Sequence, residues 1–159
     1  MRWQFVIPMT FSLQDMDNLR YKLVENNKEL EEALNIRRKV FMEEQGVSEA
    51  LEVDGNDSSA LHVIAKNGDI AVGTARVRFL NKQQAKMERM AILKPSRGSG
   101  IGKGIITFME EVLKKRGIEQ IVLHSQYYVI DFYKKCGYKE TGLPFLDADI
   151  KHITMEKTI

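Results

Sequence analysis

Residues 87–104 read MERMAILKPSRGSGIGKG, an apolar strand followed by a glycine-rich loop and the first turn of a helix. Alternating glycines at Gly98, Gly100 and Gly102 let backbone N–H groups turn toward one point without interference from Cβ atoms. The first turn of the following helix adds N–H groups without an intrahelical partner and the positive end of the helix dipole. The stretch therefore predicts an anion site, and phosphate is the ligand that we expect there.

Two common kinds of phosphate-binding glycine loop need other spacings. A Walker A loop has glycine five residues before its Gly-Lys pair and Ser or Thr after it, but Arg97 and Gly104 occupy those positions. The dinucleotide fingerprint G-x-G-x-x-G fails in each frame, because Lys103, Ile105 and Thr107 replace its third glycine. Residues 97–102, RGSGIG, instead fit a third pattern, R/Q-x-x-G-x-G/A. A glycine-rich turn without any ligand is the alternative interpretation.

The composition indicates an ordinary globular protein with one core. Of the 159 residues 43% are hydrophobic and 29% charged, and no apolar run is long enough to cross a bilayer. The net charge of +2 gives no reason to expect a nucleic-acid or membrane partner, and Lys94, Arg97 and Lys103 supply local charge suited to phosphate. The lone cysteine, Cys136, suits a reducing compartment and a buried helix position rather than a nucleophile. The N-terminus makes a poor secretory signal, so we expect a cytoplasmic protein.

The pattern along the chain predicts an α+β fold, a central mixed, mostly antiparallel sheet flanked by helices. Residues 1–18 show no clear period and are interpreted as an N-terminal extension, while residues 19–159 are expected to form one domain. Strands are expected over 21–25, 61–66, 70–80, 86–93, 118–124 and 151–157, and helices over 28–45, 101–116 and 129–136.

Three local signals support these elements. Asn27 is the expected N-cap of the first helix, and Gly46 its C-terminal glycine. Asn67-Gly68-Asp69 is typical of a hairpin turn between the second and third strands. The polar, acidic segment 47–59 is expected to be a surface loop that borders a site. In the third strand Arg76 and Arg78 alternate with apolar residues, so that basic face must meet solvent or a ligand.

In the strand over 86–93 the apolar positions change parity, from Met87 to Met90 and Ile92. One inserted residue, a β-bulge near Arg89-Met90, would cause the change and would leave a backbone N–H free to hold a ligand carbonyl. A strand buried on both faces would give the same pattern, so the sequence leaves both interpretations open.

With its flanking strand and helix, the loop from Arg97 to Gly102 resembles the acetyl-CoA pyrophosphate loop of the GNAT acetyltransferase superfamily. Residues 130–138, IDFYKKCGY, are similar to the GNAT element F-Y-x-x-x-G-F/Y after the fifth strand. The resemblance covers roughly residues 20–156 and implies the GNAT fold and acetyl-CoA as co-substrate, with no metal expected. Further segments resemble the bacterial ElaA and YjcF subgroup, namely 38–46, 73–78, 124–126 and 152–155.

The resemblance also implies where coenzyme A binds. Backbone groups of Met90, Ala91 and Ile92 would pair with the pantetheine arm like an added strand, leaving the thioester carbonyl near a free amide that acts as an oxyanion hole. Arg97 and Lys103 would add positive charge beside the pyrophosphate, although Lys103 is equally consistent with a solvated lysine. The amides expected to hold the pyrophosphate are those of Gly98, Ser99, Gly100, Ile101, Gly102 and Lys103.

Acetyl transfer to an amine expels a thiolate, and a positioned phenol can supply its proton. Tyr133 matches the family's general acid, and a half-buried aromatic residue is the alternative. Glu88, on the thioester strand, is a candidate base, but an ion pair with Arg89 or Arg78 explains it equally well. Ordered water needs no dedicated residue. Other candidate bases are Glu44, His62 and His124.

The acceptor pocket is expected between the first helix with its loop and the central strands, with Phe41, Glu44, Gln45 and Arg78 in its wall. Carboxylates suit a cationic amine and Arg78 suits an anionic group, and the sequence does not decide between them. The favoured hypothesis is an N-acetyltransferase for a small-molecule or peptidyl primary amine, acting by direct attack in a ternary complex, with a homodimer as one possible assembly. The alternative is a non-catalytic acyl-CoA sensor or interaction module on the same fold.

Overall fold

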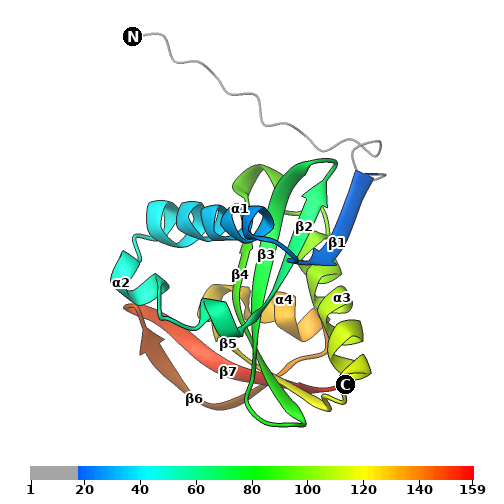
Figure 1. Ribbon diagram of the computed structural model, residues 1–159. Coiled ribbons are helices and arrows are strands. Elements are labelled where there is room, and N and C mark those ends of the chain that lie inside the picture. Colours follow the sequence, from blue (N-terminus) through cyan, green and yellow to red (C-terminus); the bar gives the residue numbers. More distant parts are fainter. Residues whose placement is uncertain (1–17) are drawn as a thin grey trace.

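A seven-stranded sheet, with helices on its two faces, organises the computed structural model, which describes residues 18–159 (Figure 1). The strand order is β1-β2-β3-β4-β5-β7-β6, and every neighbouring pair is antiparallel except β4 and β5, which are parallel. The predicted mixed, mostly antiparallel sheet is therefore confirmed. The expected extension over 1–18 lies outside the described residues, apart from Asn18.

Most of the predicted elements form within a few residues of their expected bounds. The strands are β1 (Leu19–Leu23), β2 (Leu61–Asn67), β3 (Ile70–Phe79), β4 (Gln84–Ile92), β5 (Gln120–Gln126), β6 (Lys139–Asp147) and β7 (Ile150–Thr158). The helices are α1 (Asn27–Arg37), α2 (Glu49–Glu52), α3 (Ile101–Lys115) and α4 (Ile130–Lys135). A π-helical segment, Arg38–Glu44, extends α1, and short 3₁₀ turns cover Asp57–Ser59, Lys94–Ser96 and Tyr127–Val129.

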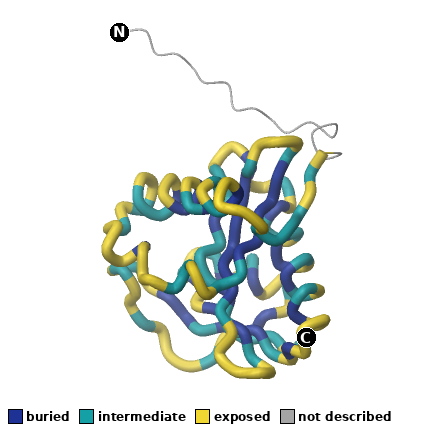
Figure 2. The backbone as a smooth tube through the Cα atoms, viewed as in Figure 1, coloured by how far each residue is buried: buried dark blue, intermediate teal, exposed yellow. Residues whose placement is uncertain are grey.

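The main core lies between the sheet and α3. Ile105, Met109 and Leu113 recur at helical spacing on α3, and each is at most 1% exposed. They pack with the inward-facing residues of the central strands, such as Val63 and Leu123. Burying each of these side chains contributes roughly 1.5–3 kcal/mol, which explains why the apolar period of this helix is so clear in the sequence. Figure 2 shows the buried positions concentrated along the central strands and α3.

The first helix lies on the other face of β2, β3 and β4. Its N-cap is Asn26 rather than the predicted Asn27, because Asn26 has an extended backbone and its side chain accepts the N–H of Glu29 at 2.9 Å. The Glu29 carboxylate in turn accepts the N–H of Glu25 at 2.9 Å. The helix does reach the predicted end near Gly46, but through the π-helical segment, which the sequence did not predict.

Besides the π-helical segment, three further elements were not predicted. The short helix α2 and the turn at Asp57–Ser59 interrupt the expected loop over 47–59. The edge strand β6 was missed because it is largely exposed and includes Gly142 and Pro144, two residues that weaken a strand pattern. Its register with β7 shifts between Thr141 and Phe145, around those residues.

Of the two interpretations left open for β4, the structure shows the bulge. Thr74 lies opposite Ala91 and Arg76 lies opposite Glu88, so β4 has one residue more than β3 between these pairs. Within the bulge Arg89 has a φ of 53°, in the left-handed region. Pairing of β4 with β5 ends at Met87. Beyond that point the two parallel strands separate, and the space between them opens into the cavity described next.

Candidate active site

A cavity of about 970 Å³ occupies the region where β4 and β5 separate. The π-helical segment, β4, the glycine loop, α4 and the turn between β6 and β7 all contribute to its wall. Every site residue predicted from the sequence lines this cavity, except Ser99 and the alternative base His62. The structure thus brings together the predicted cofactor, acceptor and catalytic residues, which lie up to 92 positions apart, from Phe41 to Tyr133.

The glycine loop presents free backbone donors. Among residues 18–159, no main-chain carbonyl accepts a hydrogen bond from the six amides between Gly98 and Lys103, and helical bonding begins with the N–H of Gly104 to Gly100 O at 3.0 Å. Gly100 has a φ of 84°, which favours glycine. The Ser99 hydroxyl donates to Ser96 O at 2.6 Å and closes the loop. These amides therefore have no main-chain partner that would compete with an anion.

Close packing holds the start of α3 near the cavity. A Cβ atom on Gly102 would lie 2.9 Å from Cζ of Phe132 on α4, so only glycine permits this approach. The two helices therefore meet at the glycine loop, and Tyr133, the residue after Phe132, reaches the same cavity.

Arg97 crosses from the glycine loop to the π-helical segment. Its Nε donates to Ile92 O at 2.9 Å, and NH2 donates to the two carboxylate oxygens of Glu44 at 3.1 and 2.9 Å. Because both side chains are more than a third exposed, this ion pair is worth at most about 1 kcal/mol. The pair with Glu44 therefore does not hold Arg97 firmly. Lys103 forms no ion pair within residues 18–159, and its role beside a phosphate stays a prediction.

Tyr133 lies on α4 with 8% of its surface exposed. Its ring packs edge-on against Phe132 and Tyr138, with centroid distances of 5.0 and 6.1 Å. Burial raises the pKa of the Tyr133 phenol well above its usual range, so the group stays protonated at neutral pH. Its hydroxyl has no hydrogen-bond partner within the described part of the chain, which leaves the proton free to be donated toward a ligand in the cavity.

Glu88 is held by three cations. Its Oε1 lies 2.6 Å from Arg78 NH2 and 3.2 Å from Lys86 Nζ, and its Oε2 accepts from Arg76 NH2 at 2.6 Å. Burial would raise the pKa of Glu88, but hydrogen bonds from Arg78 and Arg76 outweigh it and lower the pKa to about 2. A carboxylate of that pKa is a poor proton acceptor near pH 7. The geometry therefore favours the ion-pair alternative over the predicted role of Glu88 as base.

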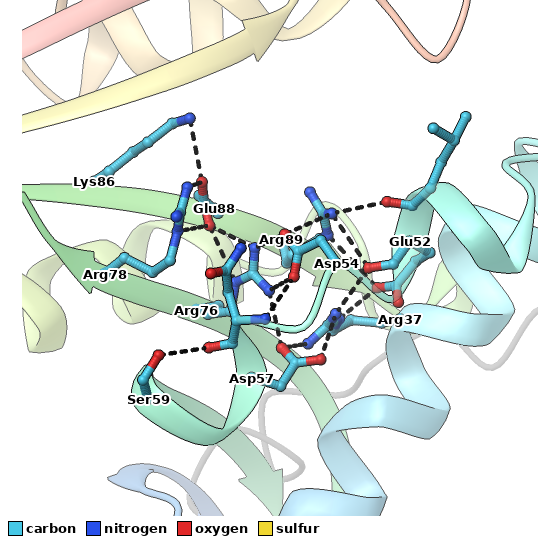
Figure 3. Close-up of polar contacts among 12 residues, drawn as sticks. Arg37, Glu52, Asp54, Asp57, Ser59, Arg76, Arg78, Lys86, Glu88 and Arg89 are labelled. Atoms are coloured by element: carbon cyan, nitrogen blue, oxygen red, sulfur yellow. Dashed lines mark hydrogen bonds and ion pairs between the residues drawn. The ribbon is translucent and has the colours of Figure 1, made fainter.

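A wider ionic network continues from Glu88 into the segment 47–59 (Figure 3). Arg76, which is 0% exposed, donates to Asp54 at 2.8 and 2.7 Å and to Asp57 at 3.0 Å. Arg37, which is 1% exposed, donates to Glu52 at 2.5 Å and to Asp57 at 2.6 Å. The network fixes α2 and the following turn against β3 and β4. In the sequence, the only indication of this network was that a strand with a basic face follows an acidic loop.

Arg89 adds a further contact between the bulge and this segment. Its NH2 group donates to the carbonyls of Leu51 and Glu52 at 3.3 and 3.2 Å and lies 3.4 Å from Asp54 Oδ2. The bulge is thus tied to the wall of the acceptor side of the cavity.

The other candidate bases lie in different settings. His124 lines the cavity, and burial together with the charge of Lys86 lowers its pKa, so its imidazole is neutral at pH 7 and can accept a proton. His62 is buried outside the cavity lining, with Nε2 2.8 Å from Asp57 O. Glu44 is paired with Arg97. His124 is therefore better placed as a base than His62 or Glu44.

Two glutamines bridge the cavity on the side where the acceptor pocket was predicted. Gln45 Nε2 donates to Gln126 Oε1 at 3.1 Å and to the Tyr128 hydroxyl at 2.9 Å, while Gln126 Nε2 donates to Gln45 Oε1 at 2.9 Å. Phe41 lines the same region. This bridge connects the π-helical segment to the end of β5. Both of these elements therefore form walls of this part of the cavity.

Residues 18–159 lack two features that would point to other kinds of protein. No helix in this part of the chain is long and apolar enough to cross a membrane. No group of three or more His, Cys, Asp or Glu side chains in it is arranged to hold a metal ion.

Comparison with known proteins identifies the family. Residues 21–159 match the acetyltransferase (GNAT) domain family, so the chain belongs to the GNAT acetyltransferases. Among curated relatives, the uncharacterized protein YyaT of Bacillus subtilis is 40% identical over 144 residues, which cover 89% of this chain and 97% of YyaT. The uncharacterized N-acetyltransferase YjcF of the same organism is 32% identical over 136 residues, covering 85% of this chain and 96% of YjcF.

Solved structures show the same fold. Escherichia coli ElaA superposes with a TM-score of 0.77 at 19% identity, covering 87% of this chain and 99% of ElaA. A GNAT family acetyltransferase from Elizabethkingia anophelis, solved with acetyl-CoA bound, gives a TM-score of 0.73 at 13% identity, covering 90% and 99% of the two chains. The predicted GNAT fold and the resemblance to ElaA and YjcF are confirmed.

Proposed function

We propose that this GNAT acetyltransferase transfers the acetyl group of acetyl-CoA to a primary amine, by direct attack while both substrates are bound. One observation carries the proposal. The free amides from Gly98 to Lys103, the separated edge of β4 and the Tyr133 hydroxyl border a single cavity. Its two sides can hold a diphosphate-bearing thioester and an amine at once. The acetyl-CoA bound to the Elizabethkingia anophelis structure supports the choice of co-substrate.

The cofactor side would be bound mainly by the main chain. The loop amides and the N-terminus of α3 would hold the pyrophosphate. Backbone groups of Met90, Ala91 and Ile92, on the part of β4 that has no neighbour in β5, would pair with the pantetheine arm. An N–H at the bulge would then donate to the thioester oxygen, where negative charge develops.

The acetyl transfer moves two protons. The amine nitrogen bonds to the thioester carbonyl carbon, the C–S bond breaks, and its electrons leave with sulfur. Tyr133 donates a proton to the departing thiolate, and the attacking amine loses a proton to His124 or to water. Removal of that proton restores a neutral amide product, so a second base such as Glu88 is not needed.

A thiol-release assay with acetyl-CoA and a broad amine panel tests this function. We expect turnover, and we expect Tyr133→Phe to lower kcat by about 10²–10³-fold while the Kd for coenzyme A changes less than threefold. The matched control is Tyr127→Phe, because Tyr127 is exposed and outside the cavity. Tight binding of acetyl-CoA without turnover of any amine would instead favour the alternative function, an acyl-CoA sensor.

The compartment is part of the same proposal. A single cysteine, whose thiol pKa is raised by burial and the nearby Glu110 carboxylate, suits a reducing environment, and we propose a cytoplasmic location.

A further inference from the structure

We propose that the acceptor amine also carries a carboxylate, which Arg78 and Lys86 bind on the floor of the cavity. This inference rests on the proposed acetyl transfer and deepens it by naming the acceptor class. The two residues face each other across β3 and β4, and both line the cavity on its acceptor side. Figure 3 shows both side chains reaching the Glu88 carboxylate.

The charges of the ionic network do not cancel where Arg78 and Lys86 lie. The part of the network next to α2 and the following turn is balanced, because three arginines meet three carboxylates. The arginines are Arg37, Arg76 and Arg89, and the carboxylates are Glu52, Asp54 and Asp57. Arg78 and Lys86 share the remaining carboxylate, Glu88, which also pairs with Arg76. One positive charge is therefore left over, and it lies at the cavity wall.

Both cations keep free N–H groups for a ligand. Arg78 uses Nε and NH2 on Glu88, and its NH1 has no acceptor among residues 18–159. Lys86 Nζ has Glu88 as its ion-pair partner in the same part of the chain. Their side chains are 32% and 19% exposed, so a bound anion would be partly shielded from water. Partial burial makes such charge-assisted hydrogen bonds stronger than those at an open surface.

Other charged groups at the cavity do not neutralise the surplus positive charge of Arg78 and Lys86. Asp147, at the end of β6, also lines the cavity, but it forms no ion pair with Lys86 or Arg78 in the described part of the chain. Glu44 is engaged by Arg97. His124 faces Lys86 with a lowered pKa and is neutral at pH 7. The surplus of one charge matches a carboxylate, whose two oxygens fit a guanidinium and an ammonium group.

The position also suits a small bifunctional acceptor. Glu88, beneath the two cations, precedes Met90 by two residues, so the two cations lie next to the bulge at which the thioester is expected. A molecule that holds its carboxylate and amine a few bonds apart can thus reach both Lys86 and the thioester site at the bulge.

A binding experiment tests the inference without turnover. Coenzyme A-loaded protein is titrated calorimetrically with N-acetyl amino acids, the matching N-acetyl amino acid amides, and N-acetyl aminoalkylphosphonates. We expect at least one acid to bind about tenfold or more tightly than its amide, and Lys86→Gln to remove that preference. The control Lys82→Gln, an exposed lysine in the β3–β4 turn, should keep it. Equal binding of every acid and its amide overturns the inference, as does tighter binding of the phosphonates.

Kinetics separate this inference from the proposed function. With saturating acetyl-CoA, amino acids should be acetylated with lower KM than their amides or the corresponding decarboxylated amines, and Lys86→Gln should raise KM for the acids alone. Turnover of amides and plain amines as efficient as that of the acids would overturn the carboxylate site and leave the acetyltransferase function intact. Absence of turnover with every amine would count against the acetyltransferase function. The calorimetric comparison of acids with their amides would then still decide whether Arg78 and Lys86 bind a carboxylate.

Discussion

Arg76→Met is predicted to be one of the most destabilising single substitutions in this protein. The side chain is fully buried and donates five hydrogen bonds to Asp54, Asp57 and Glu88. Methionine has similar bulk but leaves three carboxylates close together without their central cation. Removing one partner of a buried ion pair costs about 3–5 kcal/mol. For a chain of this length that corresponds to a Tm lower by roughly 6–20 °C.

The loss of unfolding free energy caused by Arg76→Met should depend on pH. The folded-state pKa of Glu88 is lowered to about 2 and that of Asp54 is also lowered, so both contribute stability that is present above their unfolded pKa values. That contribution disappears as the pH falls from about 4.5 toward 2. In Arg76→Met these carboxylates regain higher pKa values. The difference in unfolding free energy between the two proteins should therefore be largest at pH 7 and fall by about half at pH 3.

Urea denaturation at pH 7, 5 and 3 measures this difference. The control Arg20→Met removes an exposed ion pair with Asp69, of 4.0 Å, and should cost less than about 0.5 kcal/mol at each pH. A loss below about 1 kcal/mol at pH 7 would contradict the reasoning. So would a difference that stays constant down to pH 3, because it would mean that the carboxylates do not depend on Arg76.

Three further predictions concern the cavity. Gly100→Ala places a side chain at a φ of 84° and should cost about 1–2 kcal/mol of stability while also weakening coenzyme A binding in calorimetry; Gly117→Ala, with a φ of 80° at the end of α3, should cost the same stability without changing affinity. Glu44→Gln frees Arg97 and should tighten coenzyme A binding by up to about fivefold, whereas weaker binding would show that Glu44 does not compete with phosphate. Because the pKa of Tyr133 is raised, its phenol should stay protonated up to about pH 10, so kcat should not fall in that range through loss of this proton. A fall in kcat below about pH 10 that is absent in Tyr133→Phe would disprove this prediction.

The elements that the sequence predicted correctly are those with local signals. The glycine loop, the apolar period of α3 and the parity change in β4 each lie within one short stretch. Backbone geometry at such a stretch depends mainly on its own residues, so the glycine loop is predictable from the sequence, whereas the parity change in β4 left a bulge and a strand buried on both faces as alternatives.

The ionic network could not be predicted in the same way, because its members come from separate segments. Arg37 meets Asp57, and Arg76 meets Asp54, only after α1 and β3 pack together. For Glu88 the sequence left a candidate base and an ion-pair partner as alternatives, and its contacts with Arg76 and Arg78 favour the ion pair. The edge strand β6 was missed for another reason, since an exposed strand with an internal proline has little apolar alternation.

The central claim is that main-chain donors from Gly98 to Lys103 hold a diphosphate whose thiol-bearing arm lies along β4. Amide chemical shifts of ¹⁵N-labelled protein, followed during titration with coenzyme A, test this most directly. We predict that the largest changes fall on the amides of Gly98–Lys103 and of Met90–Ile92. Coenzyme A that does not bind, or that shifts amides elsewhere and leaves these unchanged, would contradict the account.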